Sequence, residues 1–234
     1  MAKSKEDLPY WDKYVDIKEN PEHFGIPKDH IARMHQLRGE GFTPTVIYDI
    51  GSAVGHWKVA MEDVWPEART FLFEANEDMA PFYDHYGWED YHIGLLSDTD
   101  DTERNYYYNE QNIGGNSYYK ENTGAYPSDI FRVLNTETLD KVVADKGWPH
   151  PQLMKLDVQG AECDILKGSP KVLESVEWLI VELQHINYNE GALLAADSIA
   201  LIQSLGFELI DEKFASSDLG IDADYLFRKS SEMV

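Results

Sequence analysis

Met154-Lys-Leu-Asp-Val-Gln-Gly-Ala-Glu-Cys-Asp-Ile-Leu-Lys-Gly168 is the stretch that decides the fold. An apolar approach leads into Asp157, Gly160 then permits a sharp turn, and an apolar-periodic helix follows. A strand, a turn and a helix in this order place a carboxylate at the carboxyl edge of a buried sheet, where open α/β folds bind ligands. A second acid, Glu162, falls in the first turn of the helix, where the helix dipole favours negative charge.

A similar strand and turn occur about a hundred residues earlier, in Val46-Ile-Tyr-Asp-Ile-Gly-Ser-Ala-Val-Gly55. A dinucleotide fingerprint needs glycines spaced G-x-G-x-x-G, but Ala53 and His56 occupy its second and third positions. This spacing argues against a nicotinamide-dependent oxidoreductase. The acid Asp49 would repel a pyrophosphate, whereas it suits a cofactor with a sulfonium and an ammonium group, such as S-adenosylmethionine.

The next two expected strands also end in polar residues. Arg69–Glu74 ends in an acid, about 20 residues beyond the glycine turn, where a carboxylate accepts hydrogen bonds from ribose hydroxyls. Tyr91–Leu96 is followed by Ser97 and Asp98, which we expect to face the adenine edge. Polar groups at four successive strand ends indicate a ligand site far more strongly than any one of them.

These motifs resemble the FkbM-type S-adenosylmethionine-dependent methyltransferases, from about Val46 to Arg228. The most specific part is Lys155-Leu-Asp-Val-Gln-Gly-Ala-Glu162, where the family usually reads Lys-x-Asp-x-Glu-Gly-Ala-Glu. Gln159 therefore departs from the pattern, as does Ser52-Ala53 in place of the usual Ala-Asn. Glu74-Ala-Asn76 likewise stands for a common Glu-Pro-Asn.

The resemblance implies an α/β fold: a Rossmann-like seven-stranded sheet, mostly parallel, with a terminal antiparallel hairpin. We expect this domain over residues 45–234, with residues 1–44 forming a wrapping segment and a helix that Asp29 caps. The implied activity is O-methylation of a sugar or glycan hydroxyl. The expected cofactor-binding residues are Asp49, Ile50, Gly51, Ser52, Gly55, Glu74, Ala75, Asn76, Ser97, Asp98 and Asp157.

An insertion over about residues 104–134 follows the third strand. Asn105–Asn109 and Ser117–Lys120 suggest a β-hairpin around the turn Asn112–Asn116. Its tyrosines form either a stacking platform for a sugar ring or a cover for the sheet. Asn116 and Ser117 match a polar position common in the family and are candidate acceptor-binding residues.

A hydroxyl is a weak nucleophile at neutral pH, so a base or a metal would assist its attack on a methyl group. His185, which follows a strand end, is the first candidate base, and Asp157 is the second. Glu182 is expected to orient His185 or bind the sugar, and Lys155 to pair with one of the acids. Asp157, Glu182 and Glu162 offer oxygen ligands for magnesium, but no spacing demands one, and a required metal is not favoured.

Composition limits the partners and the compartment. The net charge of −23 opposes binding to nucleic acid or anionic lipid and favours neutral acceptors. The single cysteine, Cys163, precludes an internal disulfide and is expected to pack in the core rather than act as a nucleophile. No apolar run suits a membrane helix or signal peptide, so we expect a cytoplasmic protein. A catalytically silent methyltransferase-like binding module remains the alternative function.

Overall fold

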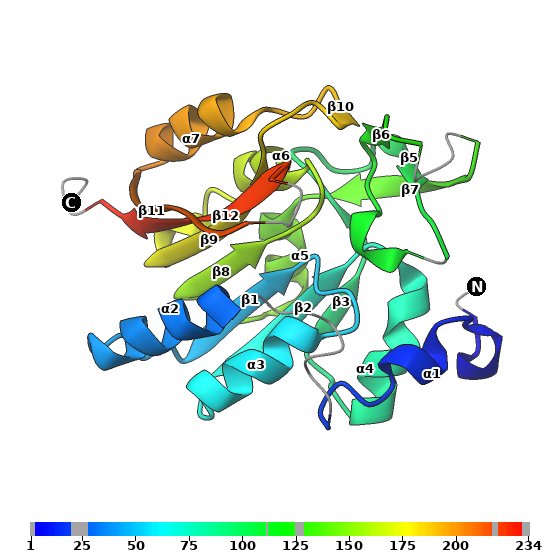
Figure 1. The fold of residues 1–234 in the computed structure, drawn as a ribbon, viewed down its shortest axis with the longest axis horizontal. Helices are drawn as coiled ribbons and strands as arrows, with labels where there is room; N and C mark the ends of the chain where they lie inside the picture. Colours follow the sequence, from blue (N-terminus) through cyan, green and yellow to red (C-terminus); the bar gives the residue numbers. More distant parts are fainter. Residues whose placement is uncertain (1–2, 20–27, 111, 125–128, 217–219, 231–234) are drawn as a thin grey trace.

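The computed structural model describes residues 3–19, 28–110, 112–124, 129–216 and 220–230. A seven-stranded sheet in the order β11-β12-β9-β8-β1-β2-β3 forms its centre (Figure 1). Strand β12 runs antiparallel to both of its neighbours, while the other pairings are parallel. The mostly parallel sheet and the terminal antiparallel hairpin are therefore confirmed. The strands span Val46–Ile50 (β1), Arg69–Glu74 (β2), Tyr91–Ile93 (β3), Leu153–Leu156 (β8), Trp178–Gln184 (β9), Phe207–Ser216 (β11) and Asp222–Lys229 (β12).

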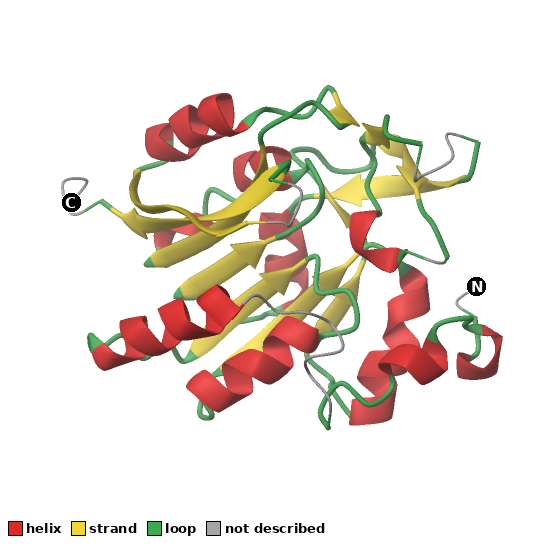
Figure 2. Cartoon of the chain, in the orientation of Figure 1, coloured by secondary structure: helices red, strands yellow, loops and turns green. Residues whose placement is uncertain are grey.

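Helices cover both faces of this sheet (Figures 1 and 2). Alternate strand residues point to opposite faces, and each set forms a separate apolar core. On one face, Ile47 and Ile180 pack with residues of α2 and α3; on the other, Tyr48 and Val181 pack with residues of α5, α6 and α7. The helices span Lys28–Gly39 (α2), His56–Val64 (α3), Ala80–Tyr86 (α4), Leu139–Lys146 (α5), Glu162–Lys167 (α6) and Ala195–Ser204 (α7).

The insertion forms a small sheet beside the carboxyl edge of the main one. Strands β4 (Leu95–Leu96), β5 (Glu103–Tyr107) and β7 (Phe131–Glu137) are ordered β4-β7-β5, with β5 and β7 antiparallel. The expected β-hairpin between residues 105–109 and 117–120 was wrong, because these segments share only one isolated bridge, between Tyr107 and Ser117. Residues Ile113–Gly115 form a 3₁₀ helix instead of a tight turn, so the two arms do not continue as a ladder. Strands β6 (Lys120–Glu121) and β10 (Asn189–Glu190) pair separately.

The N-terminal segment packs against α4. A 3₁₀ turn at Lys5–Asp7 leads to α1 (Trp11–Tyr14), and the ring of Trp11 lies 4.7 Å from that of Phe82. Part of the expected wrapping segment, residues 20–27, lies outside the described residues. The expected cap at Asp29 was wrong, since α2 already includes Lys28 and Asp29 falls within its first turn.

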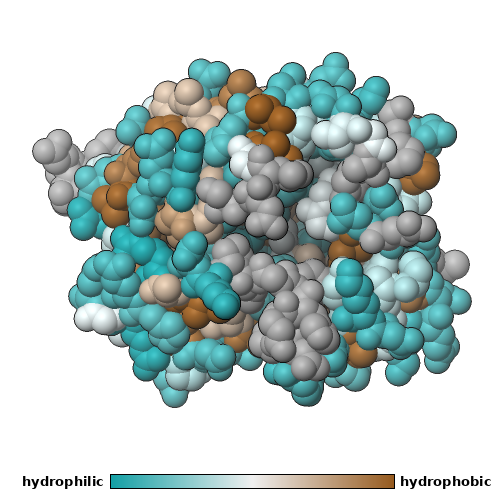
Figure 3. Space-filling model, viewed as in Figure 1, coloured by the Kyte–Doolittle hydropathy of each residue, from teal (hydrophilic) through white to brown (hydrophobic). Residues whose placement is uncertain are grey.

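The visible surface is mostly hydrophilic, in keeping with the excess of acidic residues (Figure 3). Within the described ranges, no helix is both long enough and apolar enough to cross a membrane.

Gly51 tests how closely the carboxyl ends of β1 and β8 approach each other. It has a φ of +80°, and an added Cβ would lie 1.8 Å from the carbonyl oxygen of Asp157. We expect Gly51→Ala to lower the free energy of unfolding by about 3 kcal/mol or more, because overpacking adds to left-handed strain. Gly147→Ala is the control: its φ is +64° but no atom lies within 4 Å, so about 1 kcal/mol is expected. If urea denaturation showed the same loss of unfolding free energy for Gly51→Ala and Gly147→Ala, the close approach of the two strand ends would be contradicted.

Candidate functional site

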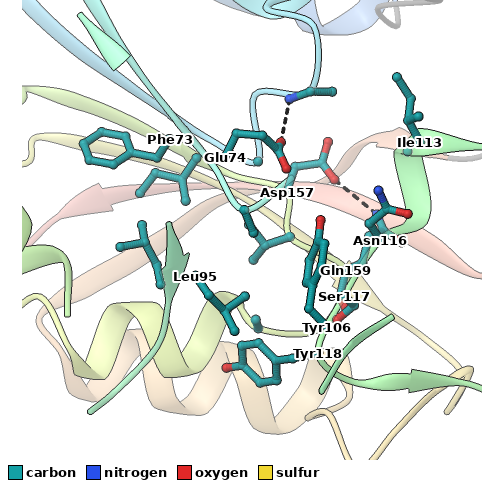
Figure 4. Close-up of a pocket in the computed structure, with 18 of the residues that line it drawn as sticks. Phe73, Glu74, Leu95, Tyr106, Ile113, Asn116, Ser117, Tyr118, Asp157 and Gln159 are labelled. Atoms are coloured by element: carbon teal, nitrogen blue, oxygen red, sulfur yellow. Dashed lines mark hydrogen bonds between the residues drawn. The ribbon is translucent and has the colours of Figure 1, made fainter. Parts of the chain in front are cut away.

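A pocket of about 310 Å³ opens at the carboxyl ends of β1, β2 and β8 (Figure 4). The carboxyl ends of three strands contribute to its wall: Ile50 and Gly51 at the end of β1, Glu74 and Ala75 at the end of β2, and Asp157 directly after β8. Parallel strands bring their carboxyl ends to one edge, which explains why segments a hundred residues apart meet here. The apolar part of the lining is formed by Ile50, Phe73, Leu95, Leu96, Ile113, Val158 and Ile165.

Glu74 is held in place by backbone donors. Its Oε2 accepts a hydrogen bond from the amide of Ala53 at 2.9 Å (Figure 4). Its Oε1 accepts one from the amide of Asn76 at 2.8 Å. Burial raises the pKa of Glu74, although these amide donors oppose the shift. Each carboxylate oxygen has capacity for a further donor, so the group is preorganised to accept hydrogen bonds from a ligand diol.

Lys155 connects two acids at the inner end of the pocket. It is only 4% exposed, and its Nζ lies 2.9 Å from Oδ2 of Asp157 and 4.0 Å from Oδ1 of Asp49. Burial alone would lower the pKa of Lys155, but the two carboxylates outweigh burial and raise it. Burial tends to raise the pKa of Asp157, yet Lys155 outweighs it and lowers that pKa to about 2. Asp157 is therefore an ionised carboxylate at neutral pH.

Asp49 is a fully buried acid whose two carboxylate oxygens have no hydrogen-bond partner in the described structure. Burial raises its pKa to about 6, and the nearby Lys155 only partly offsets that effect. Buried polar groups without partners are rare in proteins. A buried carboxylate without a hydrogen-bond partner, two residues before the pocket residue Gly51, favours positive charge nearby.

Gln159 bridges two acids from neighbouring strands. Its Nε2 donates to Oδ1 of Asp157 at 3.2 Å and also to Oε2 of Glu182. Burial and the charge of Asp157 raise the pKa of Glu182 well above its usual value, so it lies above the pKa of Asp157. The hydroxyl of Tyr188 donates to Oε1 of Gln159 at 3.3 Å.

The turn that carries Gln159 is under backbone constraint. Gln159 has a φ of +56°, and Ala53 across the pocket has a φ of +45°. Non-glycine residues in this conformation cost free energy and are enriched at functional sites. Glu162 stabilises the turn, because its Oε1 accepts hydrogen bonds from the amides of Val158 at 3.0 Å and Gly160 at 3.1 Å.

The opposite wall comes from the insertion and the N-terminal segment. Tyr106, Asn116, Ser117 and Tyr118 line the pocket from the insertion, and Tyr14 reaches it from α1. The Ser117 hydroxyl donates to the carbonyl of Gln159 at 2.7 Å, which ties the insertion to the constrained turn. The insertion thus covers the carboxyl edge of the sheet.

Several expected site residues lie together at the pocket, whereas others serve the surrounding structure. Lys155 and Glu182 contact Asp157 or Gln159 without lining the pocket. The remaining predicted cofactor contacts are also outside its described lining: Asp49, Ser52, Gly55, Asn76, Ser97 and Asp98. The Ser52 hydroxyl forms a hydrogen bond with the hydroxyl of Tyr83, and the Asn76 side chain caps a 3₁₀ helix. Leu95 and Leu96 line the part of the wall where Ser97 and Asp98 were expected.

His185 does not join the acids. Its Nδ1 lies 3.1 Å from the carbonyl oxygen of Gly220, and its Nε2 lies 3.1 Å from the hydroxyl of Tyr225. It is also absent from the described pocket lining. Both ring nitrogens are engaged away from the pocket, so this geometry does not support the expected role of His185 as the base, which stays a prediction.

His56, the first residue of α3, lines the pocket although the sequence did not mark it as a site residue. Burial lowers its pKa to about 3, so its imidazole is neutral at physiological pH. Its position directly after the glycine turn was the available signal. Cys163, by contrast, is buried, and burial raises the pKa of its thiol to about 11.

Across the described residues, no group of three or more His, Cys, Asp or Glu side chains has an arrangement that would hold a metal ion. Lys155 and Gln159 donate hydrogen bonds to Asp157, and Gln159 also donates one to Glu182.

The sheet order and the acid-lined pocket at its carboxyl edge define the class of Rossmann-like methyltransferase folds. Residues 49–209, more than half of the chain, match the methyltransferase FkbM domain, and the chain belongs to this family. A solved structure, methyltransferase FkbM from Methylobacillus flagellatus KT, shares the fold with a TM-score of 0.51 and 12% identity. That similarity covers 95% of this chain and 55% of that chain.

Among curated proteins, the chain is similar to the hexuronic acid methyltransferase AglP of Haloferax volcanii. The two are 26% identical over 174 residues, which cover 66% of each chain. The matched region thus spans just under two thirds of that relative's length.

Glu162 gives a pH-dependent test of the constrained turn. Burial raises its pKa to about 7 from 4.5, so its stabilising contribution is present below pH 4.5 and is lost as the pH rises through about 7. We expect Glu162→Gln, which cannot ionise, to remove this dependence. Between pH 5 and 7.5 the wild type should lose up to about 3 kcal/mol relative to the variant. Urea denaturation at each pH measures the free energy of unfolding, and Glu67→Gln, at an exposed position, is the control. If wild type and Glu162→Gln differ in unfolding free energy by the same amount at every pH, the raised pKa of Glu162 is contradicted.

Proposed function

We propose that this protein is an S-adenosylmethionine-dependent O-methyltransferase that acts on a hydroxyl of a sugar or glycan. Family membership supports methyl transfer. The observation that carries the choice of cofactor is the set of acids at the carboxyl edge: Glu74 and Asp157 in the pocket wall, with the orphaned Asp49 buried near Lys155.

These acids fit the chemistry of the cofactor. Glu74 would accept hydrogen bonds from the ribose hydroxyls, because its carboxylate is fixed by amides and retains acceptor capacity. Asp49 and Asp157 would favour the positive charges of the sulfonium and the ammonium. The pocket volume, about 310 Å³, lies at the lower end of the range for small-molecule sites. A pyrophosphate cofactor would instead meet the carboxylates of Glu74 and Asp157 in the pocket wall.

Asp157 is the residue best placed to handle the acceptor proton. The bound cofactor would supply an electrophilic methyl group, whose bond to sulfur would break to leave a neutral thioether. The acceptor hydroxyl would donate a hydrogen bond to Asp157, and as the new carbon–oxygen bond forms, the hydroxyl proton becomes acidic enough for this carboxylate to accept it. Lys155 and Gln159 hold its two oxygens in one orientation. This alignment contributes to the rate because the reacting oxygen must approach the methyl carbon in line.

The similarity to a hexuronic acid methyltransferase supports a sugar as the acceptor. The tyrosines of the insertion support it as well, because Tyr106 and Tyr118 present aromatic surface with polar tips beside Asp157.

Glu74 provides the test of cofactor binding. We expect Glu74→Ala to weaken the binding of S-adenosylmethionine by about 1–3 kcal/mol, because charge-assisted hydrogen bonds to the ribose are lost. Isothermal titration calorimetry measures this, and Glu67→Ala, which removes an exposed acid, is the control. Thermal unfolding of each variant without ligand separates loss of binding from loss of folding. Unchanged affinity in folded Glu74→Ala would remove Glu74 from the site.

A comparison of Asp157 with His185 tests the assignment of the proton acceptor. Asp157→Asn should lower kcat about 100-fold or more, because the variant no longer accepts a proton and loses its charged contact with Lys155. His185→Ala should leave kcat within a few-fold of the wild type. The assay follows methyl transfer to sugar glycosides by mass spectrometry. The opposite ranking of the two variants would return the role to His185.

A further inference from the structure

A second pocket, of about 280 Å³, lies next to the first on the insertion. Its lining comes from β5, from β6 with the two residues before it, and from β10, and these three strands lie close together in Figure 1. Tyr118 lines both pockets, so they share a wall. The remaining lining residues are Arg104, Tyr107, Tyr119, Lys120 and Glu190.

The charge of this second pocket is unusual for the chain. The sequence has 43 acidic residues and 20 basic ones, yet the pocket has two basic residues, Arg104 and Lys120, against one acid, Glu190. No described residue forms an ion pair or hydrogen bond with the side chain of Arg104 or Lys120. Other basic residues, such as Lys155 and Arg132, are engaged by neighbouring acids. An unpaired guanidinium presents a donor fork that matches carboxylate and phosphate oxygens.

The aromatic wall of the second pocket is fixed in position. The hydroxyls of Tyr118 and Tyr119 both donate to Oδ2 of Asp164, at 2.9 and 2.6 Å. The amide of Tyr119 donates to the Ser117 hydroxyl at 3.0 Å, and that hydroxyl reaches the carbonyl of Gln159. The wall is thus joined to the turn that positions Asp157. Rings held in this way offer a rigid surface for a sugar at little entropic cost.

We propose that the second pocket is an acceptor subsite that binds an anionic group of the sugar, a carboxylate or a phosphate, through Arg104 and Lys120. The sugar ring packs on the tyrosines, and the reacting hydroxyl enters the first pocket past Tyr118. This assignment rests on the proposed function for the hydroxyl step, but binding at the subsite is measurable without turnover.

The test is a titration in the presence of S-adenosylhomocysteine with three matched probes: methyl glucuronide, methyl glucoside and methyl glucoside 6-phosphate. We expect the wild type to bind at least one anionic probe about tenfold or more tightly than methyl glucoside. The double variant Arg104→Gln/Lys120→Gln should lose that preference. The variant Lys5→Gln/Lys171→Gln changes the net charge equally at exposed positions and should keep it. The preferred anionic probe distinguishes a carboxylate from a phosphate.

The subsite would be overturned if the wild type showed no preference for an anionic probe, or if that preference survived in Arg104→Gln/Lys120→Gln. It would also be overturned if Lys5→Gln/Lys171→Gln lost the preference to the same extent as the pocket variant. Methyl transfer to the carboxylate, detected as an alkali-labile ester, would also overturn it, because the carboxylate would then occupy the first pocket. Failure of the proposed function is a separate result, in which anionic probes bind but no sugar is methylated.

Discussion

The buried ammonium of Lys155 is the interaction on which the rest of the site depends. Strands β1 and β8 place Asp49 and Asp157 near each other in the interior, where two carboxylates without a counter-charge would be strongly unfavourable. Lys155 lies between them, almost fully removed from water. A single positive charge from one strand thus allows a sheet edge rich in acids to fold around a pocket.

The effect of Lys155 differs between the two acids. Asp157 is within direct hydrogen-bond distance and stays ionised, whereas Asp49 is farther away and has a pKa raised to about 6. Burial and the charge of Asp157 raise the pKa of Glu182 well above its usual value, and Gln159 donates a hydrogen bond to this carboxyl group. Environments that separate the pKa values of neighbouring acids assign different chemical roles to them. Here Asp157, whose pKa is lowered, faces the pocket, and Glu182, whose pKa is raised, contacts Gln159 from the adjacent strand.

The sequence predicted the central sheet and the three segments that meet at the pocket, because strand, glycine and helix are encoded locally. It did not predict the faces of the strand-end residues. Glu182 and His185 are three residues apart along an extended segment, so they point to opposite sides, and only Glu182 joins Asp157. The pairing of β5 with β7 and the approach of Tyr14 to the pocket depend on long-range packing, which no local pattern in one sequence specifies. Gln159, a departure from the family pattern, proves to bridge two acids.

A crystal structure with S-adenosylhomocysteine tests the central claim most directly. The pocket between Glu74 and Asp157 should contain the nucleoside, with both ribose hydroxyls within hydrogen-bond distance of the Glu74 carboxylate and the sulfur on the side of Asp157. A nucleoside bound elsewhere, or one whose ribose does not contact Glu74, would contradict the assignment of this pocket as the methyl-transfer site.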